Sequence, residues 1–502
     1  MVAKLPSAPD RARPQPLDDA RIDAIVAQVM SELRQGERVR HGTPPEAAAI
    51  GAPPTTPVLR HADNLYATVD QAVAAARQAF VQLRELPLAI REQMVSHLRR
   101  AGREHAQVLA LEAVQETGMG RYEDKIQKNL LNANKTAGTE MLAPTAWTGD
   151  GGMTLVEYAP YGVIGAIVPS TNPTATVICN AIAMVSAGNA VVFNAHPGAK
   201  ACSNHTVQFM NEAIVEAGGP ANLVCGVADP TIESAQALMS HKDVRLLTVT
   251  GGIGVVRAAM ASGKRAICAG PGNPPVLVDE TADLEQAGRD AVFGASFDNN
   301  VVCTDEKTLI AVDSIADELK RVMARFGAYE VDSGQLERLM KVIFQEVPPP
   351  GRHGTMNKAF IGKNANLILR EIGVEAGDEI RLILADVPND HPLVWSEQMM
   401  PVFPLTRVQN VEEGIHLAKE SEHGFRHTAV IHSKNIDNMS RMARAMDCSI
   451  FVKNGASLAG LGLGGEGFCS FTIASPTGEG MTNPRSFSRV RRCTLVDAFR
   501  IV

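Results

Sequence analysis

The fold is decided by the stretch Val163-Ile164-Gly165-Ala166-Ile167-Val168-Pro169-Ser170-Thr171-Asn172-Pro173. An apolar strand here runs into a polar turn, and a proline then marks a helix start. The same alternation continues downstream, with strands predicted at Ala190 to Asn194, Leu223 to Val227, Leu246 to Val249 and Ala266 to Cys268 and helices from Thr174, Ala199, Ile232 and Gly254. This pattern predicts a doubly wound parallel α/β sheet, in which ligands bind beyond the carboxyl ends of the strands.

A glycine-rich junction follows the fourth of these strands, at Thr250-Gly251-Gly252-Ile253-Gly254. It lacks the third glycine of a G-x-G-x-x-G motif, and no acidic residue stands where such a motif would bind a ribose. By itself this motif is weak, and an ordinary tight turn is the alternative. Within five alternating strands it indicates a nucleotide bound differently from the usual Rossmann manner.

A single cysteine is presented in a polar stretch, Ser296-Phe297-Asp298-Asn299-Asn300-Val301-Val302-Cys303-Thr304-Asp305-Glu306-Lys307. Cysteine attacks carbonyl groups as its thiolate, which requires an electropositive and partly open setting. A buried core cysteine is the alternative, and it is the interpretation that we give to most of the other seven. The eight cysteines form no C-x-x-C pair and show no metal-ligand spacing with histidine, so we expect a reducing compartment and no metal site.

Composition excludes several classes of function. The 502 residues carry a formal net charge of −7, which argues against general affinity for nucleic acid. No apolar run reaches the roughly 18 residues that a membrane helix requires. The N-terminus has no basic flank leading into an apolar core, so secretion is not indicated.

The N-terminal region has its own organisation. Residues 1–17 are rich in Pro, Ala and Arg and predict disorder, whereas Asp18 to Gln35 has apolar residues at helical spacing. Gly36 to Pro57 then reads as a linker. Such a helix either docks on its own body or binds another protein, and the residues alone leave both readings open.

The folded body is predicted to begin near Thr68, where Thr68-Val69-Asp70-Gln71 is a capping-box pattern before apolar residues at helical spacing. Helices are expected from Thr68, from Pro87, from about His105 to Thr117 and from about Tyr122 to Leu142. Further α/β alternation continues from a strand at Pro275 to Val278 to about Ile450. The glycine-dense segment 453–482 reads as a functional loop or an active-site wall, with a floppy surface loop as the alternative.

Three motifs taken together resemble those of the aldehyde dehydrogenase superfamily, specifically its CoA-acylating branch in propanediol- and ethanolamine-utilisation systems. They are Phe297-Asp298-Asn299-Asn300-x-x-Cys303, Gly270-Pro271-Gly272-Asn273-Pro274-Pro275 and Gly460-Leu461-Gly462-x-Gly464-Gly465-Glu466-Gly467. The resemblance covers roughly Ala67 to Val496. It implies a Rossmann-like nucleotide-binding domain, an α/β catalytic domain and an oligomerisation hairpin.

The resemblance assigns Cys303 as the nucleophile and Asn172 as the amide that holds the developing oxyanion. It places Glu397 on the nicotinamide ribose, with an ordinary surface carboxylate as the alternative. The full cofactor-binding set that it implies for NAD, and in turn for CoA, is Pro169, Ser170, Thr171, Asn194, His196, Pro197, Thr250, Gly251, Gly252, Gly270 and Glu397.

Two departures from hydrolytic relatives are informative. Those relatives carry a glutamate at the position of Ala269, which activates water to cleave the enzyme-bound thioester. With no carboxylate there, general base catalysis of roughly 10²- to 10⁴-fold is unavailable to water, and a thiol such as CoA becomes the acceptor. In addition, Asn194-Ala195-His196-Pro197 replaces a Lys-x-x-Glu pattern, which leaves the preference between NAD and NADP open.

The resemblance also implies context. The helix at residues 18–35 resembles an encapsulation peptide that docks on the shell proteins of a bacterial microcompartment, so we expect a bacterial cytoplasmic protein enclosed in that compartment. The expected division is residues 1–57 for targeting and linker, 58–145 and 160–276 for nucleotide binding, 277–474 for catalysis, and 146–159 and 475–502 for assembly into a homodimer or homotetramer.

The resulting hypothesis is CoA-acylating oxidation of a short aldehyde by NAD, with propionaldehyde as the expected substrate and acetaldehyde as its rival. One methylene is worth only about 1 to 3 kcal/mol of discrimination, so sequence does not separate the two. A hydrolytic aldehyde dehydrogenase and a non-catalytic shell-binding protein are the alternative functions.

Overall fold

The structure is a computed structural model that describes residues 64–501. The predicted helix at Asp18 to Gln35 and the linker at Gly36 to Pro57 lie outside the described residues. All described elements belong to one compact unit, residues 60–502.

The first large sheet is six-stranded and parallel throughout, in the order β1-β6-β5-β4-β7-β8. Its buried strands are continuous apolar runs, as expected of a parallel sheet covered on both faces. The five strands predicted from sequence are confirmed to within two residues, whereas the two-residue edge strand β1 was not predicted. The strands are β1 (Leu65–Tyr66), β4 (Val163–Ile167), β5 (Ala190–Asn194), β6 (Val224–Val227), β7 (Val244–Thr250) and β8 (Ala266–Ala269).

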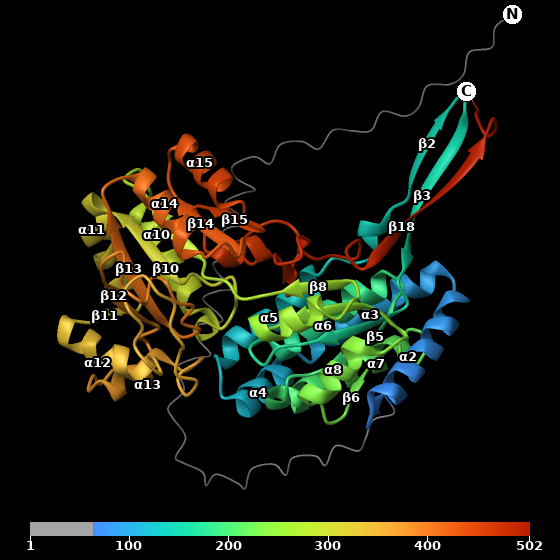
Figure 1. Ribbon diagram of the computed structural model, residues 1–502, viewed down its shortest axis with the longest axis horizontal. Coiled ribbons are helices and arrows are strands. Elements are labelled where there is room, and N and C mark those ends of the chain that lie inside the picture. The colour runs from blue at the N-terminus through green and yellow to red at the C-terminus, as the bar shows by residue number, and fades with distance from the viewer. Residues whose placement is uncertain (1–63, 502) are drawn as a thin grey trace, which may run out of the picture. The chain divides into compact units, whose positions relative to one another are not determined.

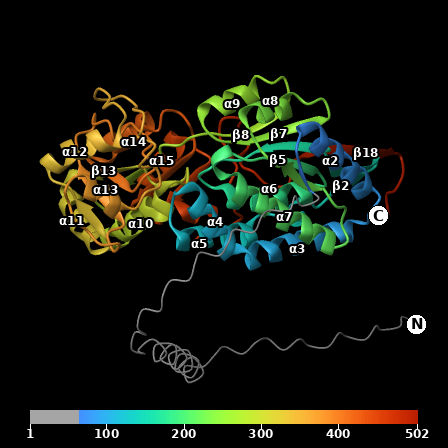
Figure 2. The same cartoon turned by 90° about the horizontal axis from the view of Figure 1, so that it is seen from below.

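Helices cover both faces of this sheet. In Figure 2, α8 and α9 lie on one side of the strands, and α6, α7 and α3 lie on the other. Thr68 caps the first described helix, since its hydroxyl accepts a hydrogen bond from the Gln71 N–H at 3.3 Å. The helices are α2 (Val69–Arg84), α3 (Leu88–Glu104), α4 (Ala106–Thr117), α5 (Tyr122–Lys135), α6 (Pro173–Ser186), α7 (Lys200–Glu216), α8 (Ile232–Ser240) and α9 (Ile253–Met260).

The helix predicted from Tyr122 to Leu142 is shorter than expected. It ends at Lys135, because Thr136 adopts an extended backbone and forms a parallel bridge with Cys469. Only a short 3-10 turn, Thr139–Leu142, follows. The end of this helix is therefore set by a contact with a distant part of the chain and not by local helix propensity.

The second large sheet is seven-stranded and also parallel, in the order β11-β12-β13-β10-β9-β14-β15. Its strands are β9 (Pro275–Val278), β10 (Thr308–Val312), β11 (Ala328–Glu330), β12 (Leu382–Asp386), β13 (Val402–Val408), β14 (Thr428–His432) and β15 (Ile450–Lys453). Two buried clusters of apolar side chains pack against it. Helices α10 and α11 pack together against this sheet, and α14 contacts its central strands β9, β10 and β13 (Figure 1). The α/β fold class is confirmed.

The helices of this second region have these bounds: α10 (Leu284–Ser296), α11 (Asp313–Arg325), α12 (Ser333–Ile343), α13 (Ala365–Glu371), α14 (Val411–Ser421) and α15 (Ile436–Met446). Among residues 64–501, every helix is too short or too polar to cross a membrane.

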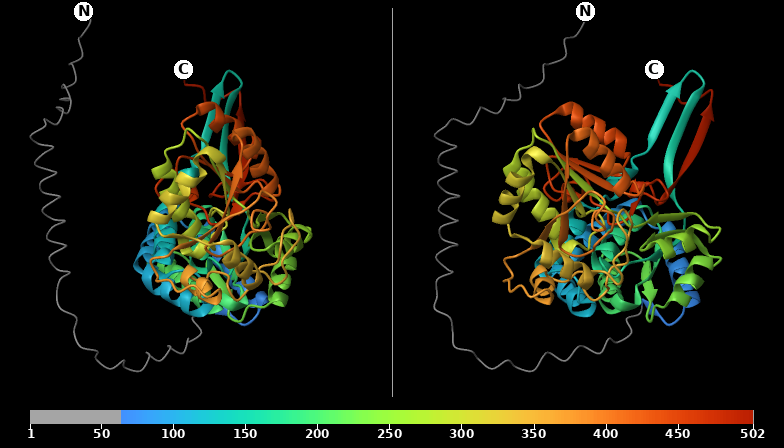
Figure 3. Two further views of the ribbon diagram at one scale, coloured as in Figure 1. Left: turned by 90° about the vertical axis from the view of Figure 1, so that its left-hand side faces the viewer. Right: turned by 60° about the vertical axis from the view of Figure 1, so that its left-hand side comes forward.

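A third sheet is antiparallel and three-stranded, in the order β18-β3-β2. Its strands are β2 (Thr145–Gly149), β3 (Gly152–Pro160) and β18 (Ser488–Val496). They extend away from the helices around the six-stranded sheet (Figures 1 and 3). The two segments that were expected to mediate oligomerisation, 146–159 and 475–502, therefore contribute neighbouring strands to one exposed sheet.

Candidate active site

A cavity of about 810 Å³ lies at the carboxyl ends of the strands of the six-stranded sheet. Every residue selected from the sequence lines it: Pro169, Ser170, Thr171, Asn172, Asn194, His196, Pro197, Thr250, Gly251, Gly252, Gly270, Cys303 and Glu397. The volume is in the range of sites that hold cofactors and drug-sized ligands. The topology explains the convergence, because parallel strands place their following loops at one edge.

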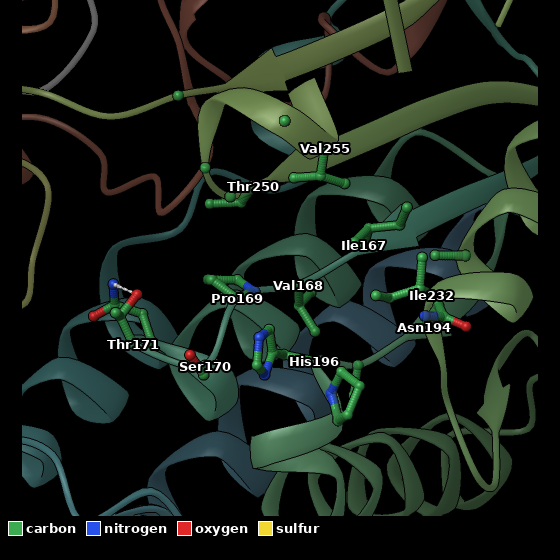
Figure 4. A pocket seen from close by; sticks show the side chains of 18 of the residues that line it. Ile167, Val168, Pro169, Ser170, Thr171, Asn194, His196, Ile232, Thr250 and Val255 are labelled. Carbon is green, nitrogen blue, oxygen red and sulfur yellow. Dashed lines mark hydrogen bonds between the residues drawn. The ribbon is translucent and has the colours of Figure 1, made fainter. Parts of the chain in front are cut away.

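Helix N-termini face this cavity from several sides. Asn172 precedes α6, Thr231 caps α8 and Gly252 precedes α9, and all three residues line the cavity. Unpaired N–H groups and positive partial charge at such ends favour phosphate. In Figure 4, Thr250 and Val255 lie across the cavity from Ser170 and His196. The lining therefore combines apolar walls with donors suited to a dinucleotide.

The glycines of the junction at residues 250–254 leave space in the cavity, and their backbone does not adopt the left-handed conformation. Gly251, Gly252 and Gly254 all lie outside the left-handed region. A Cβ built at Gly252 or Gly254 would meet open space, so a side chain there would project into unfilled volume. Gly252 and Gly254 therefore leave space in the cavity beside the Val255 side chain, which also lines it.

Cys303 follows a run of three left-handed residues, Asp298, Asn299 and Asn300, with φ values of 46°, 55° and 65°. Aspartate and asparagine tolerate this conformation better than other side-chain-bearing residues do. Asn300 is held on both sides, since its amide donates to the Ala295 and Glu306 carbonyls and its Oδ1 accepts from Lys307 Nζ at 2.7 Å. The turn that presents the thiol is therefore strained and firmly braced.

The described residues around Cys303 do not favour its thiolate form. Burial is the main cause that raises the pKa of this thiol to about 12, and the carboxylates of Glu397 and Asp305 contribute in the same direction. Lys307 opposes them as the lowering cation. The thiol is partly open to the cavity, as expected, but in this state it is held protonated.

Glu397 lies in the cavity wall and not on the outer surface, so the surface alternative is excluded. The Gly272 N–H approaches its Oε1 at 3.5 Å, and burial raises the pKa of the carboxyl group. Of the lining residues that the structure describes, it is the one carboxylate. Ala269, at the end of β8, is only 1% exposed and supplies a methyl group.

The glycine-dense segment 453–482 packs behind the cavity, and none of its described residues is among those that line it. It holds a 3-10 turn, Ser457–Leu461, and two short strands, β16 (Ile473–Ala474) and β17 (Gly480–Met481). Leu458 and Leu461 are fully buried, which rules out a floppy surface loop. The segment contacts the strand ends next to the cavity, since Thr472 Oγ1 lies 3.3 Å from Thr250 Oγ1 and Thr477 Oγ1 accepts from the Cys268 N–H at 3.0 Å, and its role as an active-site wall stays a prediction.

Sequence reasoning missed a buried ionic cluster beside the site. Lys125 and Lys128 of α5 both contact the Asp298 carboxylate, and Lys128 also contacts Asn172. Burial lowers the pKa of Lys128 to about 8, against the opposing effect of Asp298. A lysine on an amphipathic helix is normally predicted to be exposed, so no sequence signal indicated this buried pair.

Within residues 64–501, no group of three or more His, Cys, Asp or Glu side chains is placed to hold a metal ion. The described cysteines are all free thiols.

Residues 51–341 and 379–466 match the model of the aldehyde dehydrogenase family. The acetylating acetaldehyde dehydrogenase EutE of Salmonella typhimurium is 51% identical over 443 residues, which is 88% of this chain and 94% of the relative.

Two solved structures are also similar. One is Rhodopseudomonas palustris propionaldehyde dehydrogenase with bound CoA and an acylated cysteine, with a TM-score of 0.85 and 45% identity over 88% of this chain and all of that chain. The other is a propionaldehyde dehydrogenase from the Clostridium phytofermentans fucose utilisation bacterial microcompartment, with the same score, identity and coverage.

Proposed function

The chain belongs to the aldehyde dehydrogenase family, and we propose that it catalyses the CoA-acylating oxidation of a short-chain aldehyde with NAD. The observation that carries this is the composition of the cavity: a thiol and an oxyanion amide are present, and the position of the hydrolytic base is a buried alanine. Propionaldehyde is the proposed substrate and acetaldehyde the second candidate, since relatives named for each are similar to this chain.

Cys303 adds to the aldehyde carbonyl, forming a C–S bond, and its proton passes to the oxygen of the resulting thiohemiacetal. The N–H donors of Asn172 and of the Cys303 backbone stabilise the negative charge while it develops. NAD supplies the acceptor for the hydride that leaves the carbon. Loss of that hydride together with the hydroxyl proton, which passes to solvent, leaves a thioester on Cys303. The CoA sulfur then forms a C–S bond to the acyl carbon while the bond to Cys303 breaks, and the CoA thiol proton passes to the Cys303 sulfur.

The residues that would hold NAD are those of the strand ends and helix N-termini, with Glu397 on the nicotinamide ribose. The open space at Gly252, where a Cβ would meet nothing within 4 Å, suits close approach of a nucleotide backbone. The same groups would receive the ADP portion of CoA after NADH leaves. Binding of NAD and CoA in turn to one cavity is consistent with the absence of the Lys-x-x-Glu pattern at residues 194–197.

The acylating reaction is tested by NADH formation from propionaldehyde and NAD, with and without CoA, in the intact protein and in Cys303→Ala. Steady turnover should require CoA and should vanish in the variant, because water lacks a base at position 269. Equal turnover without CoA would instead identify a hydrolytic enzyme. Repeating the assay with acetaldehyde ranks the two substrates by kcat/KM.

The proposal extends to location and assembly. The segment 18–35 targets the protein to a microcompartment shell in the bacterial cytoplasm, and the β18-β3-β2 sheet joins it into a homodimer or homotetramer. The proposed domain roles follow the same division, with 58–145 and 160–276 binding nucleotide and 277–474 supplying catalysis. Removal of residues 1–35 should abolish co-purification with shells and leave kcat unchanged; retained co-purification would refute the targeting role.

A further inference from the structure

Lys128 is a buried cation that connects two parts of the candidate site. Its side chain on α5 is 2% exposed. The Nζ atom donates to Asn172 Oδ1 at 2.7 Å and also contacts the Asp298 carboxylate. A lysine is costly to bury, and here its charge is directed at two acceptors that belong to different elements.

The contact with Asn172 fixes which way that amide faces. An ammonium group is only a donor, so the atom that meets it must be the amide oxygen. The amide nitrogen of Asn172 donates one hydrogen to Thr171 Oγ1 at 3.2 Å, and the second N–H remains available. Asn172 lines the cavity with Cys303, and its side chain makes no capping bond to α6. The hydrogen bond from Lys128, and not a capping bond to α6, therefore fixes the orientation of the Asn172 side chain.

The contact with Asp298 links the same cation to the turn that carries the nucleophile. Asp298 is fully buried and begins the left-handed run before Cys303. Its carboxylate accepts from the Arg121 N–H at 2.8 Å and from Lys125 Nζ at 3.0 Å. Lys125 shares Asp298 with Lys128, but only Lys128 donates a hydrogen bond to Asn172, so the two lysines differ in their contact with this amide.

We propose that Lys128 is a positioning residue that holds the Asn172 amide with its nitrogen toward the oxyanion and ties it to the turn of Cys303. The proposal rests on the proposed function, which assigns the oxyanion role to Asn172. A donor fixed before reaction does not have to reorganise as charge appears, and a cation behind the amide oxygen polarises the N–H. Without Lys128 the amide is free to rotate and present its oxygen to the developing anion.

The test compares Lys128→Met with Lys125→Met. Both variants remove one cation from Asp298, but only the first releases Asn172. Lys128→Met should lower kcat about 10- to 100-fold, at or below the effect of deleting an oxyanion donor, while KM for the aldehyde changes little. Lys125→Met should retain most of kcat. Lys128→Gln, which keeps a neutral donor, should fall between the wild type and Lys128→Met.

Two further readouts separate positioning from general damage. Alkylation of Cys303 by iodoacetamide develops no carbonyl oxyanion, so its rate should be the same in Lys128→Met and in Lys125→Met. In a background of Asn172→Ala, Lys128→Met should lower kcat by less than about twofold, because the group that it positions is already gone.

Equal losses of kcat in Lys128→Met and Lys125→Met would overturn the proposal, as would full additivity with Asn172→Ala. If Lys128→Met does not fold, the same comparison is made with Lys128→Gln. Failure of the proposed function appears differently, as absence of CoA-dependent aldehyde oxidation in the wild-type protein.

Discussion

Gly120 lies so close to Asp298 that a Cβ at position 120 would be 2.0 Å from the Asp298 Oδ1 atom. Gly120 has a φ of +80°, and its N–H donates to the Gly362 carbonyl at 2.8 Å. The loop between α4 and α5 is therefore pressed against the turn that presents Cys303. This contact explains why a backbone without a side chain is needed there.

Gly120→Ala should lower the free energy of unfolding by about 2 to 4 kcal/mol, because it adds a clash with a buried carboxylate to left-handed strain. Gly218→Ala is the matched control, since Gly218 has the same φ of +80° and a Cβ there meets nothing within 4 Å. Gly218→Ala should lower the free energy of unfolding by only about 1 kcal/mol. Urea unfolding measures both, and equal losses would show that strain alone matters.

The reactivity of Cys303 should depend steeply on pH. Since the pKa of this thiol is raised to about 12, the thiolate fraction and the alkylation rate should rise about tenfold per pH unit from about pH 7 to about pH 10. Mass spectrometry of the Cys303 peptide separates this reaction from that of exposed Cys493. A plateau below about pH 9 would contradict the raised pKa.

Glu397→Gln should make Cys303 more reactive at a given pH in the protein without cofactor. The Glu397 carboxylate raises the pKa of the thiol, so its removal lowers that pKa, whereas Asp305 and Lys307 remain in place. The alkylation rate at about pH 8 should rise several-fold, while the KM for NAD increases because a ribose ligand is lost. An unchanged alkylation rate would show that Glu397 does not act on Cys303.

Asn194→Asp should shift the cofactor preference toward NAD. The Ser234 hydroxyl donates to Asn194 Oδ1 at 2.6 Å, and aspartate keeps that acceptor while adding a negative charge to the cavity. The ratio of KM for NADP to KM for NAD should increase about tenfold, because a 2′-phosphate meets the new charge. Ser234→Ala serves as the uncharged control, and an equal shift there would point to lost orientation of the side chain.

Val490→Asp should weaken self-association. Val490 and Trp147 are exposed and occupy the same face of the β18-β3-β2 sheet by register and strand alternation. A buried charge at the proposed interface should shift the protein toward monomer in light scattering. Val81→Asp, on the exposed side of α2, is the control and should leave the oligomer intact. An unchanged mass in Val490→Asp would place the interface elsewhere.

Much of the site was predictable because the loops that line a ligand site in a parallel sheet directly follow its strands in the sequence. Pro169 to Asn172 directly follow one strand, and Thr250 to Gly252 directly follow another, so strand prediction alone placed them at one edge. Cys303 and Glu397 joined this edge only through motif resemblance.

The sequence by itself determined the alternation of strands and helices and the isolated cysteine, since each follows from the order and type of neighbouring residues. The missing base at Ala269 became visible only through the resemblance to hydrolytic relatives. Only the tertiary structure decided that Lys128 is buried between Asn172 and Asp298, that Glu397 raises the pKa of Cys303, and that segment 453–482 lies behind the cavity. Burial and electrostatic coupling depend on which distant residues fold together, and helical or strand periodicity does not encode that choice.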